Sequence, residues 1–127
     1  MNSVKIKSVD EPRVRHCMQQ YAEQLLSTHP DVEEVVVFGS FADGTYAPGS
    51  DIDVLIILRS SDKPVWDRIA EFLPGAFPVG LDLFPYTRAE LALMETSPMT
   101  AALRRSQWRY QRTTGTSKQV PGGHQSF

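Results

Sequence analysis

Three short apolar runs, rich in β-branched residues, set the strongest limit on how this chain can fold. The runs are VEEVVVF at 32–38, IDVLIIL at 52–58 and VGLDLFPY at 79–86. Each has the length of a strand, and glycine, proline or serine separates one from the next. None approaches the length of a membrane span. The runs therefore predict the strands of one sheet.

Segments with helical periodicity separate these strands. Residues 10–28 place apolar side chains at helical spacing, with Asp10 and Pro12 near the start, and a second such segment spans 66–73. A short helix is also expected between residues 41 and 47. We expect these helices to pack onto the sheet, with Trp66 in the core or at an interface.

Two further helices are expected after the third strand. Thr87 and Glu90 have the spacing of a capping box, and Ser97-Pro98 opens a helix that extends to about residue 107. Helices and strands thus alternate along the whole chain. This order predicts an α/β or α+β fold in which helices flank one sheet.

The chain has 127 residues, of which 41% are hydrophobic and 22% are charged, and these values suit one ordinary domain. We expect residues 1–108 to form that domain. Residues 109–127 are rich in Gly, Ser and Thr and are expected to be a flexible basic tail, whose cations either face solvent or contact phosphate or an acidic partner. Cys17 is the only cysteine, which excludes an internal disulfide and a cysteine-based metal site. No export signal opens the chain, so the expected location is the cytoplasm.

Three aspartates stand where an apolar strand residue would be less costly. Asp51 and Asp53 are two residues apart in a predicted strand, so their side chains share one face. Adjacent carboxylates repel each other unless a cation lies between them, and Mg²⁺ is the natural choice. Asp82 lies inside the third apolar run. If that strand neighbours the Asp51 strand, three carboxylates converge, which suffices for a two-metal clamp on phosphoryl transfer.

Each aspartate also has an alternative interpretation without a metal. Asp51 can cap a turn, and Asp53 can pair with an arginine. Asp82 can be an edge-strand carboxylate bonded to backbone or to Arg88. These alternatives differ from the metal hypothesis in where they place the three side chains.

The segment between the first two strands suits a phosphate group. Gly39-Ser40 follows a strand directly and offers backbone N–H groups and a hydroxyl, while the missing side chain of Gly39 permits close approach. Gly44 and Gly49 can relieve backbone strain in the loop that follows, and the side chain of Ser50 can bond to the backbone just before Asp51.

These residues together carry a resemblance. Gly39-Ser40, ten intervening residues and then Asp51-Ile52-Asp53, with Gly44 and Ser50 between, resembles the signature of the polymerase-beta-like nucleotidyltransferase superfamily. The chain length is similar to that of its minimal nucleotidyltransferase branch. The resemblance implies a small mixed sheet flanked by helices. It also implies a nucleoside triphosphate as substrate, with ATP the first candidate, and two Mg²⁺ ions as cofactor. The implied reaction is transfer of a nucleoside monophosphate to an acceptor hydroxyl.

The resemblance further implies roles for individual residues. Asp51 and Asp53 would bind the metal ions, and Asp82 would complete the metal site and help to deprotonate the acceptor. The triphosphate would be held by Gly39 and Ser40, with Ser50 beside them.

The resemblance also implies a partner. Minimal members are often antitoxins paired with a HEPN ribonuclease toxin, and some transfer AMP to a tyrosine of that toxin, so a hetero-oligomer is expected without a nucleic-acid or membrane partner. One departure is Asp43, because many members carry arginine immediately before the glycine that Gly44 matches. Two alternatives therefore stay open. One is a binding module that neutralises a toxin without catalysis. The other, which is less favoured, is an enzyme that modifies a small molecule.

Overall fold

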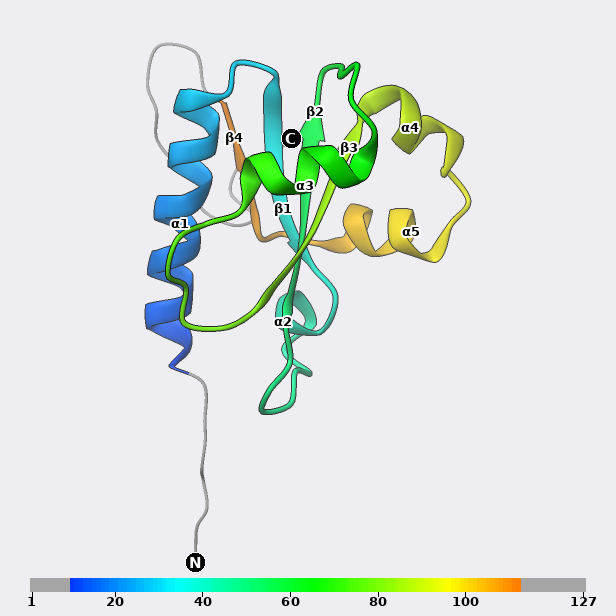
Figure 1. The fold of residues 1–127 in the computed structure, drawn as a ribbon. Coiled ribbons are helices and arrows are strands. Elements are labelled where there is room, and N and C mark those ends of the chain that lie inside the picture. The colour runs from blue at the N-terminus through cyan, green and yellow to red at the C-terminus, as the bar shows by residue number, and fades with distance from the viewer. Residues whose placement is uncertain (1–9, 113–127) are drawn as a thin grey trace, which may run out of the picture.

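The structure, a computed structural model, describes residues 10–112 of the chain, which alternate between helices and strands (Figure 1). The elements in chain order are α1 (Glu11–Thr28), β1 (Val32–Phe38), α2 (Ser40–Asp43), β2 (Ile52–Leu58), α3 (Val65–Phe72), β3 (Leu81–Thr87), α4 (Arg88–Leu93), α5 (Pro98–Arg105) and β4 (Arg109–Gln111). The strands form one four-stranded sheet in the order β3-β2-β1-β4. β1 is antiparallel to β2 and β4, whereas β2 and β3 are parallel. The expected mixed sheet of an α+β fold is therefore confirmed.

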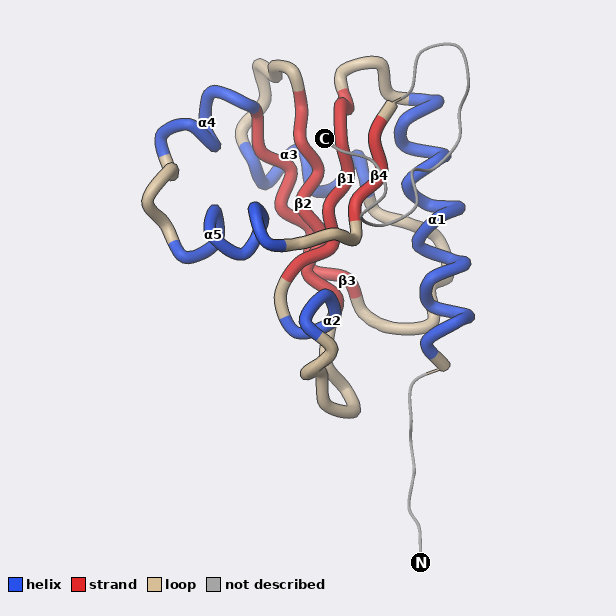
Figure 2. The backbone as a smooth tube through the Cα atoms, turned by 180° about the vertical axis from the view of Figure 1, so that it is seen from behind, coloured by secondary structure: helices blue, strands red, loops and turns tan. Residues whose placement is uncertain are grey.

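Helices cover both faces of this sheet (Figures 1 and 2). Because side chains alternate along a strand, each central strand contributes to two cores. Val35 and Val37 of β1 lie in the larger core, with side chains of α1 and the end of α3, while Val36 and Phe38 lie in a smaller core with Leu103 of α5. Within residues 10–112, no helix is both long enough and apolar enough to cross a membrane.

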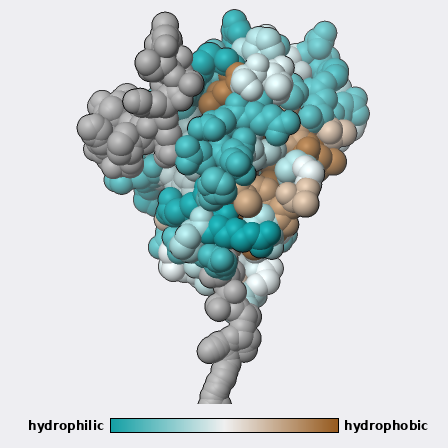
Figure 3. Space-filling model, turned by 90° about the vertical axis from the view of Figure 1, so that its left-hand side faces the viewer, coloured by the Kyte–Doolittle hydropathy of each residue, from teal (hydrophilic) through white to brown (hydrophobic). Residues whose placement is uncertain are grey.

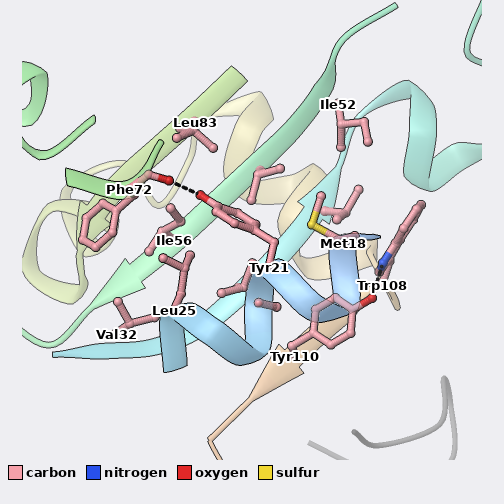
Figure 4. Packing of buried hydrophobic residues seen from close by; sticks show 14 of the residues in the cluster. Met18, Tyr21, Leu25, Val32, Ile52, Ile56, Phe72, Leu83, Trp108 and Tyr110 are labelled. Atoms are coloured by element: carbon pink, nitrogen blue, oxygen red, sulfur yellow. Dashed lines mark hydrogen bonds between the residues drawn. The ribbon is translucent and has the colours of Figure 1, made fainter. Parts of the chain in front are cut away.

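The larger core is closed by tyrosine and tryptophan side chains whose polar atoms are paired (Figure 4). The hydroxyl of Tyr21 on α1 donates to the carbonyl oxygen of Phe72 at 2.5 Å, and the indole of Trp108 donates to the hydroxyl of Tyr110 at 3.0 Å. Burial raises the pKa of the Tyr21 phenol. These bonds let large amphipathic side chains be buried without an unsatisfied polar atom.

Most predicted elements occur where the sequence places them. The helix expected over 10–28 is α1, and the strands expected over 32–38 and 52–58 are β1 and β2. The capping box forms as predicted, since Thr87 accepts from the backbone N–H of Glu90 while the Glu90 carboxylate accepts from that of Thr87. The helix expected between residues 41 and 47 is shorter: α2 ends at Asp43, because the next residue, Gly44, has a left-handed φ of 77°.

The predicted boundary of the tail at residue 109 is wrong. Residues 109–111 form β4, whose Tyr110 is opposite Val35 of β1 and is only 5% exposed. Arg109 pairs with the buried carboxylate of Glu34 at 2.7 Å. Contacts with residues far away in the chain thus order this short strand, and the local composition gave no sign of them. The rest of the predicted tail, 113–127, lies outside the described residues.

The structure excludes one of the two expected positions of Trp66. This side chain of α3, expected in the core or at an interface, is 73% exposed and therefore lies outside the core. The helix instead buries Phe72 and the guanidinium of Arg68, which forms a two-pronged ion pair with Glu90 at 2.7 and 2.9 Å. Arg68 also donates to the carbonyl oxygen of Pro85 at 2.9 Å. One cation thereby joins α3, β3 and α4.

Candidate active site

The chain turns sharply where β1 ends. Gly39 has a φ of 77° and a ψ of −152°, a conformation that residues other than glycine rarely adopt. Its carbonyl oxygen accepts from the N–H of Asp43 at 3.0 Å, so the turn leads directly into α2. Ser40, the first residue of α2, is partly exposed. The predicted phosphate-binding pair Gly39-Ser40 is thus placed at the end of β1.

Two of the predicted carboxylates face each other across neighbouring strands. Asp53 of β2 is in register with Asp82 of β3, and on its other side it is opposite Phe38 of β1. Parallel strands lie about 4.8 Å apart, so residues in register on one face are close neighbours. The strand order therefore places Asp53 next to Asp82, two of the three carboxylates that the sequence predicted would converge.

Uncompensated negative charge gathers around Asp53. Partial burial raises the pKa of the Asp53 carboxyl above its usual value, and the charges of Asp82 and then of Asp51 raise it further. Among residues 10–112, none of these three side chains forms an ion pair with an arginine or lysine. Arg88, a possible partner of Asp82, instead pairs with Glu33 at 2.7 Å. The arrangement is electrostatically suited to a cation.

Two of these carboxylates lie directly against a glycine. A Cβ atom at Gly39 would lie 2.3 Å from Oδ2 of Asp53, and a Cβ atom at Gly80 would lie 2.3 Å from Oδ1 of Asp51. Neither distance is compatible with a side chain at the glycine while the carboxylate keeps its place. Gly80 was not among the predicted site residues. It lies inside the run predicted as a strand, 79–86, and a glycine inside a strand often marks close approach of a group to the backbone.

The donor set fits a divalent cation that is completed by a substrate. Within the described part of the chain, no three His, Cys, Asp or Glu side chains are gathered closely enough to hold a metal ion by themselves. Mg²⁺, however, is commonly held by one or two carboxylates together with water and substrate phosphates. Asp53 and Asp82, in register and beside Asp51, offer that smaller set.

The loop between α2 and β2 holds the remaining predicted residues. The hydroxyl of Ser50 accepts from the N–H of Ala47 at 3.0 Å, so Ser50 closes the turn before Asp51. Gly49 in that turn has a φ of 86°. Asp43, the residue that departs from the family pattern, is exposed, and its Oδ2 lies 4.0 Å from the guanidinium of Arg105.

Comparison with known proteins identifies the class to which this fold and this site belong. Residues 18–96 match the family described as Nucleotidyltransferase domain. The match covers more than half of the chain and includes all six predicted site residues. The chain therefore belongs to the nucleotidyltransferase domain family, which supports nucleotidyl transfer as its general activity. Domains of this family typically use a nucleoside triphosphate and a divalent metal.

Other comparisons add little detail. No curated protein matches the chain. Among solved structures, the chain is similar to a candidate nucleotidyltransferase from Sulfolobus solfataricus, with 23% sequence identity and a TM-score of 0.48. That alignment covers 86% of this chain and 94% of the other.

Proposed function

We propose that this chain is a Mg²⁺-dependent nucleotidyltransferase that transfers AMP from ATP to a hydroxyl group of a protein partner. The observation that supports this most directly is the placement of Asp53 opposite Asp82, with Asp51 close enough to raise the pKa of Asp53 further. Carboxylates held this close attract a divalent cation, and a triphosphate supplies the ligands that the protein lacks.

Each residue has a role in this proposal. Asp51, Asp53 and Asp82 would hold the divalent cation together with the triphosphate, and the cation would neutralise charge on that triphosphate. Gly39 and Ser40 hold the phosphate chain through backbone N–H groups and a hydroxyl, and Ser50 shapes the loop beside them. The acceptor oxygen attacks the α-phosphorus as the bond to pyrophosphate breaks. The acceptor proton passes to Asp82, which is exposed and therefore reachable.

A protein acceptor is favoured by the simplicity of the fold. Residues 10–112 form one sheet with its covering helices, and they include no second folded unit that would enclose a small acceptor. The resemblance to antitoxin-type minimal nucleotidyltransferases supports a HEPN-type toxin as the partner, and a tyrosine hydroxyl as the acceptor group.

Labelled ATP tests the proposal. The chain is incubated with ATP labelled on the α-phosphate, Mg²⁺ and the candidate partner, and label on the partner is measured. We expect labelling that falls by about 10²–10⁴-fold in Asp53→Asn, since that change removes one carboxylate charge from the site. Labelling by the native chain no greater than by Asp53→Asn would refute the proposal.

A binding module without catalysis is the second candidate, and the surface of α3 favours it. Trp66 of α3 and Leu73, which directly follows that helix, are 73% and 63% exposed. On the face of the molecule drawn in Figure 3, apolar residues gather in one area beside a broad hydrophilic surface. Exposed apolar side chains often mark protein contacts. If Asp51→Ala and Asp53→Ala abolish neutralisation of the partner while the complex still forms, binding alone does not explain the function.

A further inference from the structure

We infer that Gly80 is a positioning residue for Asp51: the absence of a side chain at position 80 is what lets the Asp51 carboxylate occupy its place at the entry to β2. This inference rests on the proposed function for its catalytic meaning. Its structural basis is the space at Gly80, where an added Cβ would lie 2.3 Å from Oδ1 and 3.0 Å from Cγ of Asp51. Carbon and oxygen atoms that are not bonded to each other do not approach so closely.

The backbone at Gly80 is held in place from several sides. Its carbonyl oxygen accepts from the N–H of Ile52 at 2.9 Å, immediately before the ladder between β2 and β3 begins with Ile52 opposite Leu81. Val79 and Leu81, the neighbours of Gly80, both pack against the larger core. The clash between a side chain at position 80 and the Asp51 carboxylate would therefore be relieved by movement of Asp51 and not by movement of this backbone.

Gly80 is not required for backbone conformation. The glycines with positive φ among residues 10–112 are Gly39, Gly44 and Gly49, so alanine at position 80 meets no left-handed strain. Asp51 is exposed, and its carboxylate can turn toward solvent at small cost. Alanine at position 80 should thus leave the fold intact while it displaces one carboxylate of the site.

The same relation occurs on the other side of β2, which supports a role in the site. Gly39, at the end of β1, leaves the space that the carboxylate of Asp53 occupies, as Gly80 does for Asp51. The two glycines therefore limit where the carboxylates of Asp51 and Asp53 can lie. A substitution at Gly39 would combine a clash with backbone strain, whereas a substitution at Gly80 would produce the clash alone.

The chain offers a matched control. Gly75 lies in the same connection between α3 and β3, has no positive φ, and would have no atom within 4 Å of an added Cβ. Gly80→Ala and Gly75→Ala are therefore the same chemical change with and without the contact to Asp51. The full chain is used throughout, with Mn²⁺ and ATP as the probes.

Two measurements are made on each variant in addition to the thermal midpoint of unfolding. The first is the ¹³C resonance of the Asp51 carboxyl without metal, assigned by its absence in Asp51→Ala. The second is the affinity for Mn²⁺ in the presence of ATP. We expect Gly80→Ala to shift the Asp51 resonance and to weaken Mn²⁺–ATP binding by about 10–100-fold, as displaced metal-site neighbours do. Its thermal midpoint should stay within about 4 °C of native, and Gly75→Ala should resemble the native chain in all three respects.

A double-variant cycle separates the contact from other effects. In the Asp51→Ala background the carboxylate is absent, so Gly80→Ala should weaken binding no further. An equal loss in both backgrounds, or an unchanged Asp51 resonance in Gly80→Ala, would overturn the inference. Absence of Mn²⁺–ATP binding by the native chain would instead refute the proposed function, and the resonance would still decide whether Gly80 positions Asp51.

Discussion

Replacement of Glu90 by glutamine tests how the fold holds β3, the strand that carries Asp82. The Arg68 side chain is only 5% exposed, and Glu90 is the carboxylate bonded to it. Breaking a buried ion pair costs about 3–5 kcal/mol, because the remaining charge is left without a partner. Glu90 itself is 35% exposed, so solvent screens part of this loss. We expect Glu90→Gln to lower the free energy of unfolding by about 2–3 kcal/mol in urea denaturation.

The chain contains a control with the same chemistry and different burial. Glu33 accepts from Nε of Arg88 at 2.7 Å, but Arg88 is 57% exposed. Glu33→Gln should therefore cost less than about 1 kcal/mol. Similar losses in the two variants would refute the reasoning, because burial of the arginine would then not decide the cost.

The pH dependence gives an independent measure of the same ion pair. The hydrogen bond from Arg68, with the bonds from Thr87, lowers the pKa of Glu90 from 4.5 to about 2. A carboxyl with a lowered pKa stabilises the fold above its unfolded pKa, and this contribution is lost as the pH falls through the folded value. The stability difference between native chain and Glu90→Gln should therefore shrink between about pH 4.5 and pH 2. A difference that stays constant over this range would show that the ionised carboxylate is not its source.

Two further changes test the turn beside the site and the larger core. Gly39→Ala should destabilise by more than Gly44→Ala for two reasons: Gly39 has a ψ of −152°, outside the left-handed helical region in which Gly44 lies, and only at Gly39 would the new side chain displace Asp53. The left-handed strain at Gly44 costs about 1–2 kcal/mol, and thermal unfolding compares the two variants. Tyr21→Phe leaves the carbonyl oxygen of Phe72 without its donor, so urea denaturation should show a loss of about 1–3 kcal/mol.

The elements that the sequence predicted correctly are those with local signals. α1 has a helical period and an aspartate cap, and β1 and β2 are uninterrupted β-branched runs that end at turn residues. β4 has no such signal, because its three residues are ordered by Glu34 and Val35 in a strand more than 70 positions earlier. That Trp66 lies outside the core did not follow from the sequence, for a similar reason. A buried ion pair with Glu90 fixes the side of α3 that faces inward, and a count of apolar residues does not include it.

The candidate site likewise has features that local sequence predicts and features that it does not. The expectation that Asp51 and Asp53 share a face came from strand geometry alone, and the approach of Asp82 to Asp53 followed once the third strand was expected beside the second. The space left by Gly80 did not follow, because it depends on a residue 29 positions earlier whose place is set by the parallel pairing of β2 with β3. Sequence reasoning thus identified the charged groups, and the structure was needed to show what leaves room for them.

The structure also changes how Asp43, the one departure from the family pattern, bears on the choice between an enzyme and a binding module. Asp43 puts a negative charge where many members of the superfamily carry arginine. It lies in α2, but its carboxylate is 4.0 Å from the guanidinium of Arg105, which comes from α5. An exposed pair at this distance adds little stability, yet the nearby cation still offsets the negative potential at longer range. Arg105 lies beyond the matched family span, 18–96. Because a cation from outside that span balances Asp43, this residue no longer favours a binding module over an enzyme, and the choice depends on the carboxylates of β2 and β3.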